Sequence, residues 1–244
     1  MIHEEARVLI STEKLHKYCE KGSSGEAAVK CLDMRIMQGE FVIVHGISGK
    51  QKNAFFGMFG CLERPDSGKY YFDYEDIGLA KDEMLDDIRR NKIGYLFRDF
   101  RLIERLNVRQ NIEVPMYGLD ISVGEKSERV SKALNYLGLQ GLEKEKVTEL
   151  TDLQKQQAAL ARAIVNDPLV IIADEPSANL NIEGEGWLME QLWRLNTEGT
   201  AILLVTAEDS IETEGAYRKL SFVNGSLSSD MEVYGQHGGN GGSV

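Results

Sequence analysis

The chain has 244 residues, enough for one domain of ordinary size with room for an inserted lobe. Its 39 acidic residues outnumber its 28 basic ones, and the resulting net charge of −11 argues against a general nucleic-acid binder. No apolar run approaches the roughly 20 residues of a membrane span, and the first residues do not resemble a signal peptide. Three cysteines without CxxC spacing do not make a disulfide framework, so a reducing compartment is expected.

Strands and helices are predicted to alternate along the chain. The predicted strands, in chain order, cover residues 6–11, 34–46, 69–77, 92–97, 168–176 and 200–209. The predicted helices cover residues 52–62, 81–91, 124–139, 154–166 and 185–196. Because the strand at 200–209 begins with an unbroken apolar run, it fits a sheet covered on both faces. The alternation therefore predicts an α/β fold with a largely parallel sheet.

Three segments depart from this alternation. The polar, glycine-rich residues 20–27 predict a hairpin or loop. Charged sequence of helical period predicts a helical lobe inserted at about 98–160. Residues 1–228 are therefore expected to form a single domain. Residues 229–244, which end in GQHGGNGGSV, are expected to form a disordered tail.

The segment VIVHGISGKQKNA (42–54) places a strand, a loop and a helix in series, which is the context of a phosphate-binding P-loop. Such a loop needs glycines whose backbone N–H groups face phosphate oxygens, a lysine for the outer phosphates and a hydroxyl for Mg²⁺. The residues that fit are Gly46, Ser48, Gly49 and Lys52. The structural alternative is a polar turn capped by Asn53.

A second segment, LVIIADEP (169–176), ends a predicted strand in Asp174 and Glu175. In phosphoryl-transfer enzymes an aspartate at this place holds Mg²⁺, and an adjacent glutamate can orient or polarise water. The alternative is a strand end with two solvated acids.

Together these motifs and several longer blocks resemble an ATP-binding cassette (ABC) nucleotide-binding subunit. The resemblance is greatest to the subfamily that serves lipoprotein-release, macrolide-export and cell-division complexes. It runs from about residue 8 to 225, and its best stretches are 61–77, 89–116 and 159–181. It implies a RecA-like P-loop core with an N-terminal antiparallel β-subdomain and an inserted α-helical subdomain. It also implies head-to-tail dimers that hold ATP between one P-loop and the signature loop of the partner.

The resemblance assigns site residues by position. The nucleotide-binding positions are Tyr18, Gly46, Ser48, Gly49, Lys50, Gln51, Lys52, Asn53 and Ala54. Tyr18 stands where an aromatic side chain often stacks on adenine, although it can also be an aromatic at the core or rim. Asp174 is the expected metal ligand, with Asn53 as a weaker one, and Glu175 is the expected catalytic carboxylate. ATP and Mg²⁺ are the implied cofactors.

The P-loop and the Q-loop depart from the family pattern. Gln51 replaces a glycine where the backbone should approach phosphate closely. Asn53 and Ala54 replace the Ser-Thr pair of the family, so the Mg²⁺ hydroxyl and one phosphate donor are lost. Arg98 replaces the Q-loop glutamine, and a guanidinium cannot ligate a cation. It can pair with a phosphate or with Asp99, or it can be an exposed arginine in a salt bridge.

The signature and switch positions depart as well. The family signature Leu-Ser-Gly-Gly-Gln is replaced by Leu150 followed by Thr151, Asp152, Leu153 and Gln154. Asp152 places a negative charge where a γ-phosphate should dock, although it is also a good helix N-cap. Ala207 replaces the switch histidine and cannot hydrogen-bond a phosphate or a water. Asn181 replaces an aspartate in the loop after the acidic pair.

These departures favour a hydrolysis-defective subunit that braces or regulates membrane subunits at the cytoplasmic face of the cell membrane. The alternatives are a slow but active ATPase subunit and a soluble cassette protein acting in translation or DNA repair. The surface 98–116 is expected to dock a helix of a membrane subunit through Phe100, Leu102, Ile103 and Leu106, unless these residues only fill the seam below the helical lobe. Homodimers and heterodimers both remain open, and no nucleic-acid partner is expected.

Overall fold

The computed structural model describes residues 7–20, 27–47, 49–206 and 215–234. Its strands are β1 (Val8–Tyr18), β2 (Ala27–Met37), β3 (Phe41–His45), β4 (Ser67–Phe72), β5 (Glu75–Asp76), β6 (Ile93–Leu96), β7 (Val170–Asp174), β8 (Ala201–Val205), β9 (Tyr217–Val223) and β10 (Ser226–Val233). Its helices are α1 (Gly49–Phe59), α2 (Asp82–Asn91), α3 (Val108–Glu113), α4 (Val123–Tyr136), α5 (Asp152–Ile164) and α6 (Ile182–Thr197), with 3₁₀ turns η1 (Val114–Met116) and η2 (Val147–Glu149). Within these ranges no helix is both long and apolar enough to span a bilayer.

A six-stranded sheet with the order β10-β9-β3-β8-β7-β6 forms the centre of the molecule. Its strands are parallel except for β10, which pairs antiparallel at one edge. Every residue of β3 and β8 is buried, and alternate side chains face opposite sides. Val42 and Val44 enter one hydrophobic core, whereas Phe41 and Ile43 enter the other. The prediction of a largely parallel sheet covered on both faces is therefore confirmed.

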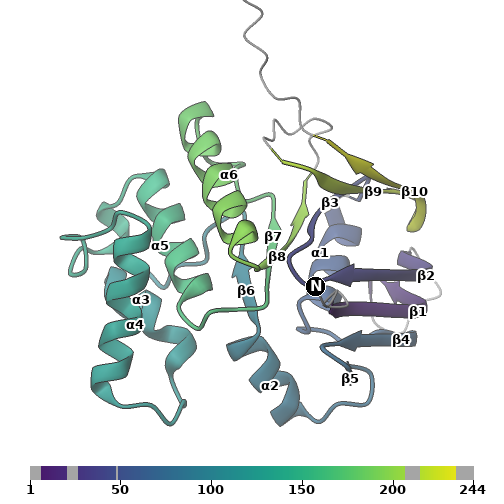
Figure 1. Ribbon diagram of the computed structural model, residues 1–244, viewed down its shortest axis with the longest axis horizontal. Helices are drawn as coiled ribbons and strands as arrows, with labels where there is room; N and C mark the ends of the chain where they lie inside the picture. The colour runs from purple at the N-terminus through teal and green to yellow at the C-terminus, as the bar shows by residue number, and fades with distance from the viewer. Residues whose placement is uncertain (1–6, 21–26, 48, 207–214, 235–244) are drawn as a thin grey trace, which may run out of the picture.

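The two faces of this sheet are covered differently. A second, antiparallel sheet with the order β2-β1-β4-β5 lies on the α1 side, and α1 contacts both β1 and β2. Helices α3, α4, α5 and α6 lie on the other side (Figure 1). The antiparallel subdomain and the helical subdomain of the predicted RecA-like fold are both present. The helical lobe extends slightly beyond the predicted limit of 160, because α5 continues to Ile164.

Helix caps and one buried amide hold the helical lobe in shape. Asn107 and Gln110 form a reciprocal capping box at the start of α3, and Ser122 caps α4. The fully buried Asn111 amide bonds both the backbone N–H (2.7 Å) and the carbonyl oxygen (3.1 Å) of Ile103. The segment that leads from the sheet into the lobe is therefore fixed by a side chain of the lobe itself.

The last two strands are absent from the sequence prediction. β9 and β10 form a hairpin whose turn residues, Asn224 and Gly225, both have positive φ (49° and 82°). An Asn-Gly pair between strand-like runs is a strong signal for this turn, and it could have revealed the hairpin. Because β10 continues to Val233, residues 229–233 belong to a strand and not to a disordered tail. Residues 235–244 lie outside the described residues.

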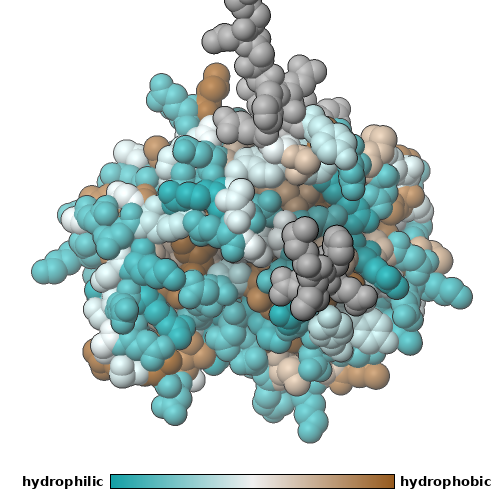
Figure 2. Space-filling model, viewed as in Figure 1, coloured by the Kyte–Doolittle hydropathy of each residue, from teal (hydrophilic) through white to brown (hydrophobic). Residues whose placement is uncertain are grey.

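The surface agrees with the acidic composition. Figure 2 shows a mostly hydrophilic face on which apolar residues form separate small spots. Scattered apolar side chains of this kind are normal on a soluble domain.

Candidate functional site

The carboxyl ends of the parallel strands bring the predicted motifs together. β3 ends at His45, just before the P-loop segment, and β7 ends at Asp174. His45 is buried at the end of its strand. β8 lies between β3 and β7, and β6 pairs with β7 on the other side. Loops that follow neighbouring parallel strands meet at one edge of a sheet, which is where ligands bind in α/β proteins.

The P-loop segment requires glycine at its first position. Gly46 has φ of +80°, and a Cβ atom there would lie 2.0 Å from the backbone oxygen of Phe222. Gly49, with φ of +52°, begins α1, whose first turn contains no acidic residue. A helix N-terminus without acidic residues favours an anion nearby. Ser48 lies outside the described residues.

Lys52 does not point into open space. It is 8% exposed, and its ammonium nitrogen lies 3.0 Å from Asp174 Oδ1 and 2.9 Å from Glu175 Oε1. The structure thus brings together the three residues that the sequence assigned to phosphate, metal and water. The lysine forms ion pairs with both carboxylates.

Arg98 contacts the second carboxylate oxygen of Glu175, whose first oxygen contacts Lys52. Its Nη1 donates to Glu175 Oε2 at 2.9 Å, while Asp99 pairs with Arg101 at 3.5 Å. Of the open alternatives for Arg98, the pairing with Asp99 is therefore wrong, and the exposed arginine in a salt bridge is confirmed, with Glu175 as its partner. The reason is the sheet register: Leu96 pairs with Ala173, so the residues two positions further on come side by side. The backbone oxygen of Arg98 also accepts from the Asn179 side chain at 2.5 Å.

Tyr18 and the first turn of α1 are neighbours. Tyr18 is the last residue of β1 and pairs with Ala27, whose carbonyl oxygen accepts from the Gln51 side chain at 3.2 Å. Lys50 forms an ion pair with Glu20, two residues beyond Tyr18. The strand end that carries Tyr18 is thus fastened to the P-loop helix. Its role as an adenine platform stays a prediction.

Asn53 is not the helix cap that the structural alternative required. It lies inside α1, one turn beyond its first residue, and it is exposed. Ala54 is buried at 4% exposure. Asn53 therefore stays available as a weak polar contact, whereas Ala54 serves packing.

The residues present do not fit a Mg²⁺ site. Asp174 Oδ1 is buried against Lys52, and the neighbouring Glu175 accepts from two cations of the chain. The remaining candidate ligand, Asn53, offers one amide oxygen, whereas Mg²⁺ is usually bound through carboxylates in octahedral geometry. In the part of the chain that the structure describes, no three His, Cys, Asp or Glu residues form a metal cluster.

The signature segment has become a helix cap. Thr151, not Asp152, is the N-cap of α5: its hydroxyl accepts from Gln154 N at 3.2 Å, and Gln154 Oε1 accepts from Thr151 N at 2.9 Å. The expectation for Asp152 is therefore wrong, because a Thr-x-x-Gln capping box places the cap one residue earlier. Asp152 is exposed in the first turn and pairs with Lys155 at 3.0 Å, and Leu153 is half-buried.

The signature and the P-loop do not meet within one chain. Figure 1 shows α5 and α1 on opposite sides of the central sheet. Asn181 caps α6 by accepting from Gly184 N at 2.9 Å, so this substitution keeps a structural role. The switch position, Ala207, lies outside the described residues.

A groove, which we call the arginine groove, lies between α2, β6, η1 and α5. It has a volume of about 420 Å³ and an apolar floor that includes Tyr95, Phe97, Val114 and Pro115. Four arginines line it, namely Arg89, Arg90, Arg101 and Arg162, together with one acid, Asp86. Sequence reasoning missed this groove, because its residues come from four separate segments.

The arginines of the groove are held in different ways. Arg162 donates to the carbonyl oxygens of Arg101 (2.5 Å) and Phe100 (2.8 Å), and burial lowers its pKa to about 10. The Arg101 guanidinium lies 4.2 Å from the centre of the Phe97 ring. Arg89 pairs with Asp86 and donates to the carbonyl oxygen of Cys61 at 2.8 Å. Among the described residues, neither Arg90 nor Arg162 has a carboxylate within ion-pair distance.

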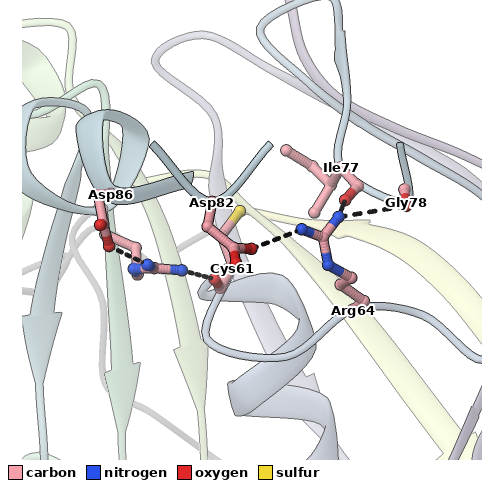
Figure 3. Close-up of polar contacts among 7 residues, drawn as sticks. Cys61, Arg64, Ile77, Gly78, Asp82 and Asp86 are labelled. Atoms are coloured by element: carbon pink, nitrogen blue, oxygen red, sulfur yellow. Dashed lines mark hydrogen bonds and ion pairs between the residues drawn. The ribbon is translucent and has the colours of Figure 1, made fainter. Parts of the chain in front are cut away.

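Helix α2, which forms one wall of the arginine groove, is held in place by Arg64 in the loop that follows α1. Arg64 donates to the carbonyl oxygens of Ile77 and Gly78 at 3.2 Å each, and it pairs with Asp82 at 2.8 Å (Figure 3). These bonds fix the start of α2 relative to the loop that follows α1.

The four apolar residues predicted to dock a partner divide between core and surface. Phe100 is 8% exposed and belongs to the core of the helical lobe, so it fills the seam. Leu102, Ile103 and Leu106 are half-buried, and Ile103 lines the arginine groove.

Known proteins resemble this chain in sequence and in structure. The sequence profile described as ABC transporter matches residues 29–178. The uncharacterized ABC transporter ATP-binding protein YknY of Bacillus subtilis is 39% identical over 203 residues, which cover 83% of this chain and 88% of YknY. The macrolide export ATP-binding/permease protein MacB of Wolinella succinogenes is 31% identical over 92% of this chain, but the chain spans only 35% of MacB.

Among solved structures, the dimeric ATP-binding cassette MJ0796 bound to ADP and Pi superposes with a TM-score of 0.79 at 29% identity. That match covers 93% of this chain and 100% of MJ0796. The fold, the order of the motifs and these likenesses agree: the chain belongs to the ABC transporter family and has the fold of its ATP-binding cassettes.

Proposed function

We propose that this chain is a cassette subunit that hydrolyses ATP poorly or not at all. In this role it braces or regulates the membrane subunits of a transporter-type complex at the cytoplasmic face of the cell membrane. The observation that carries the proposal is the pairing of Asp174 and Glu175 with Lys52 and Arg98. Both carboxylates that the chemistry needs are neutralised by cations of the chain itself.

Hydrolysis needs a metal and a water held in register with the γ-phosphate. A guanidinium beside Glu175 opposes a divalent cation: at ~5 Å and an effective dielectric of ~20, their repulsion is about 7 kcal/mol before screening. Asn53 replaces the metal-binding hydroxyl, and Ala207 offers no hydrogen bond to a γ-phosphate. Because catalytic groups act as a unit, the loss of several removes nearly all of their joint effect.

Dimerisation with an intact cassette would not restore a complete site. In a head-to-tail dimer each ATP lies between the P-loop of one chain and the signature of the other. This chain carries defects on both sides, Gln51 and Asn53 in the P-loop and Asp152 in the signature. Each of the two composite sites would therefore contain one damaged half. Homodimers and heterodimers are both compatible with this reasoning.

The arginine groove is the surface that we propose for docking a helix of a membrane subunit. It combines an apolar floor with a surplus of positive charge, which suits an amphipathic helix that carries carboxylates. Most of its lining lies in 89–116, one of the three stretches that best resemble transporter cassettes, and the MacB relative is named an ATP-binding/permease protein. The net charge of −11 disfavours a nucleic-acid partner and hence a soluble role in translation or DNA repair.

The second candidate is a slow but active ATPase, which the retained Lys52, Asp174 and Glu175 favour. The test is the complex purified from membranes through a tag on this subunit, with its components identified by mass spectrometry. Phosphate release is then compared between the wild-type complex and the Glu175→Gln complex. Equal rates support the proposal, whereas a rate that falls with Glu175→Gln shows that this subunit's own site turns over. Recovery without membrane subunits would favour the soluble role.

A further inference from the structure

We propose that the nucleotide site of this chain binds a nucleoside triphosphate without a divalent cation, with Arg98 in place of the metal as the counter-ion. The inference rests on the nucleotide-binding role proposed above and names the ionic form of the ligand. It follows from the disagreement between the family's Mg²⁺ and the residues that are present.

The first step is the local charge balance. Asp174 and Glu175 carry two negative charges, and their side chains are only 16% and 17% exposed. Lys52 and Arg98 supply two positive charges at 2.9–3.0 Å. With a glutamine at position 98 the same cluster would carry a surplus negative charge, which attracts a metal ion. Arg98 removes that surplus.

The second step is the supply of unused donors. The Lys52 ammonium has three N–H groups and forms ion pairs with two carboxylates. Arg98 uses Nη1 for Glu175, and within the described ranges its Nε and Nη2 have no hydrogen-bond partner. Its side chain is 61% exposed, so these nitrogens face solvent. Lysine and arginine donors beside the amides of α1 suit phosphate oxygens.

A triphosphate that carries a metal ion would bind this site less well than the triphosphate alone. The cation would have to approach Asp174, which is already paired, and it would meet the like charge of Arg98. Among the described residues of the P-loop segment, the exposed amide of Asn53 is a further candidate ligand, and it is a weak one. Metal-free triphosphate, in contrast, needs no ligand from the paired carboxylates, and it can accept from the exposed nitrogens of Arg98 at the N-terminus of α1. The metal should therefore weaken binding at this site.

The experiment measures ATP binding by titration calorimetry, once with Mg²⁺ in excess and once with EDTA. The full-length wild-type chain should bind more tightly in EDTA, by about threefold or more. Arg98→Gln should reverse the order, so that Mg²⁺ tightens binding by about tenfold. Arg35→Gln is the matched control: it removes the same charge from an exposed arginine on β2 and should bind as the wild type does.

Tighter binding of the wild type in Mg²⁺ would overturn the proposal, and so would the absence of binding at about 1 mM ATP in EDTA. An unchanged metal preference in Arg98→Gln would show that Arg98 is not the counter-ion. Phosphate release, measured in the same samples, reports separately on the proposed loss of hydrolysis. The two proposals can therefore fail independently.

Discussion

Replacing Glu175 with glutamine should change the stability of this protein more than its function. In an active cassette this carboxylate polarises the attacking water, and the amide stops turnover. Here Glu175 accepts from Lys52 at 2.9 Å and from Arg98 at 2.9 Å. The amide keeps the shape of the side chain and removes its charge, so it isolates the electrostatic part of these contacts.

The magnitude follows from distance and exposure. At 2.9 Å and an effective dielectric of ~20, each ion pair has a Coulomb energy of about 6 kcal/mol before desolvation. Most of this is offset, because Lys52 keeps Asp174 as a partner and Arg98 is 61% exposed to water. A net loss of about 1–2 kcal/mol remains, which lowers Tm by about 2–8 °C for a domain of this size.

The assay combines thermal unfolding with complementation in cells. Asp99→Asn is the matched control, because Asp99 is 72% exposed and lies 3.5 Å from Arg101. This substitution should change the free energy of unfolding by no more than about 0.5 kcal/mol, so the Tm of the variant should stay close to that of the wild type. Glu175→Gln should lower Tm and still restore the wild-type phenotype. If the variant expresses and assembles normally but loses the phenotype, the site is chemically active and the reasoning is refuted.

Four further outcomes are expected. Titration with Mg-ATP should give weak or no binding, and a dissociation constant near about 1 μM would contradict this. Ile103→Glu, in the lining of the arginine groove, should abolish recovery with membrane subunits at an unchanged Tm, and retained recovery would count against docking there. Arg218 lowers the pKa of Asp230, so their ion pair stabilises the fold above the ordinary pKa of 3.8 and is lost as pH falls through the lowered value. Urea unfolding should therefore show Asp230→Asn less stable than the wild type at pH 7, by a margin that narrows below about pH 4. Gln156 is fully buried, and neither of its amide atoms has a hydrogen-bond partner among the described residues. Gln156→Met should therefore raise the free energy of unfolding by about 1–2 kcal/mol, and a destabilised variant would contradict this.

The core of the fold could be predicted because its strands carry their own signal. β7 and β8 are short apolar runs at the centre of a covered sheet, where both faces demand hydrophobic side chains. The β9–β10 hairpin was missed because its exposed outer strand alternates with polar residues and lacks such a run. Its clear marker was the turn at Asn224 and Gly225.

The residues of the candidate site could be proposed from the sequence, but the contacts between their side chains could not. The sequence located Lys52, Asp174 and Glu175, because each follows a strand in a recognisable context. It did not predict the contact of Arg98 with Glu175, which depends on β6 lying next to β7 in a particular register. The arginine groove was missed for the same reason, since side chains distant in sequence assemble it.

The contacts of Arg98 and Arg162 show how the proposed nucleotide site is connected to the arginine groove. The segment from Arg98 to Arg101 begins at the proposed nucleotide site and ends at the arginine groove. Glu175 holds its first side chain, and Arg162 holds the carbonyl oxygens of Phe100 and Arg101. Phe100 and Arg101 both have positive φ (59° and 45°), so this backbone is confined to an uncommon conformation. A ligand can shift such a segment only by as much as it prefers one conformation over another. A nucleotide that leaves the ion pair of Arg98 with Glu175 intact has little preference for one conformation of this segment over another. A rigid segment of this kind therefore suits a subunit that supports its membrane partners better than one that drives their movement.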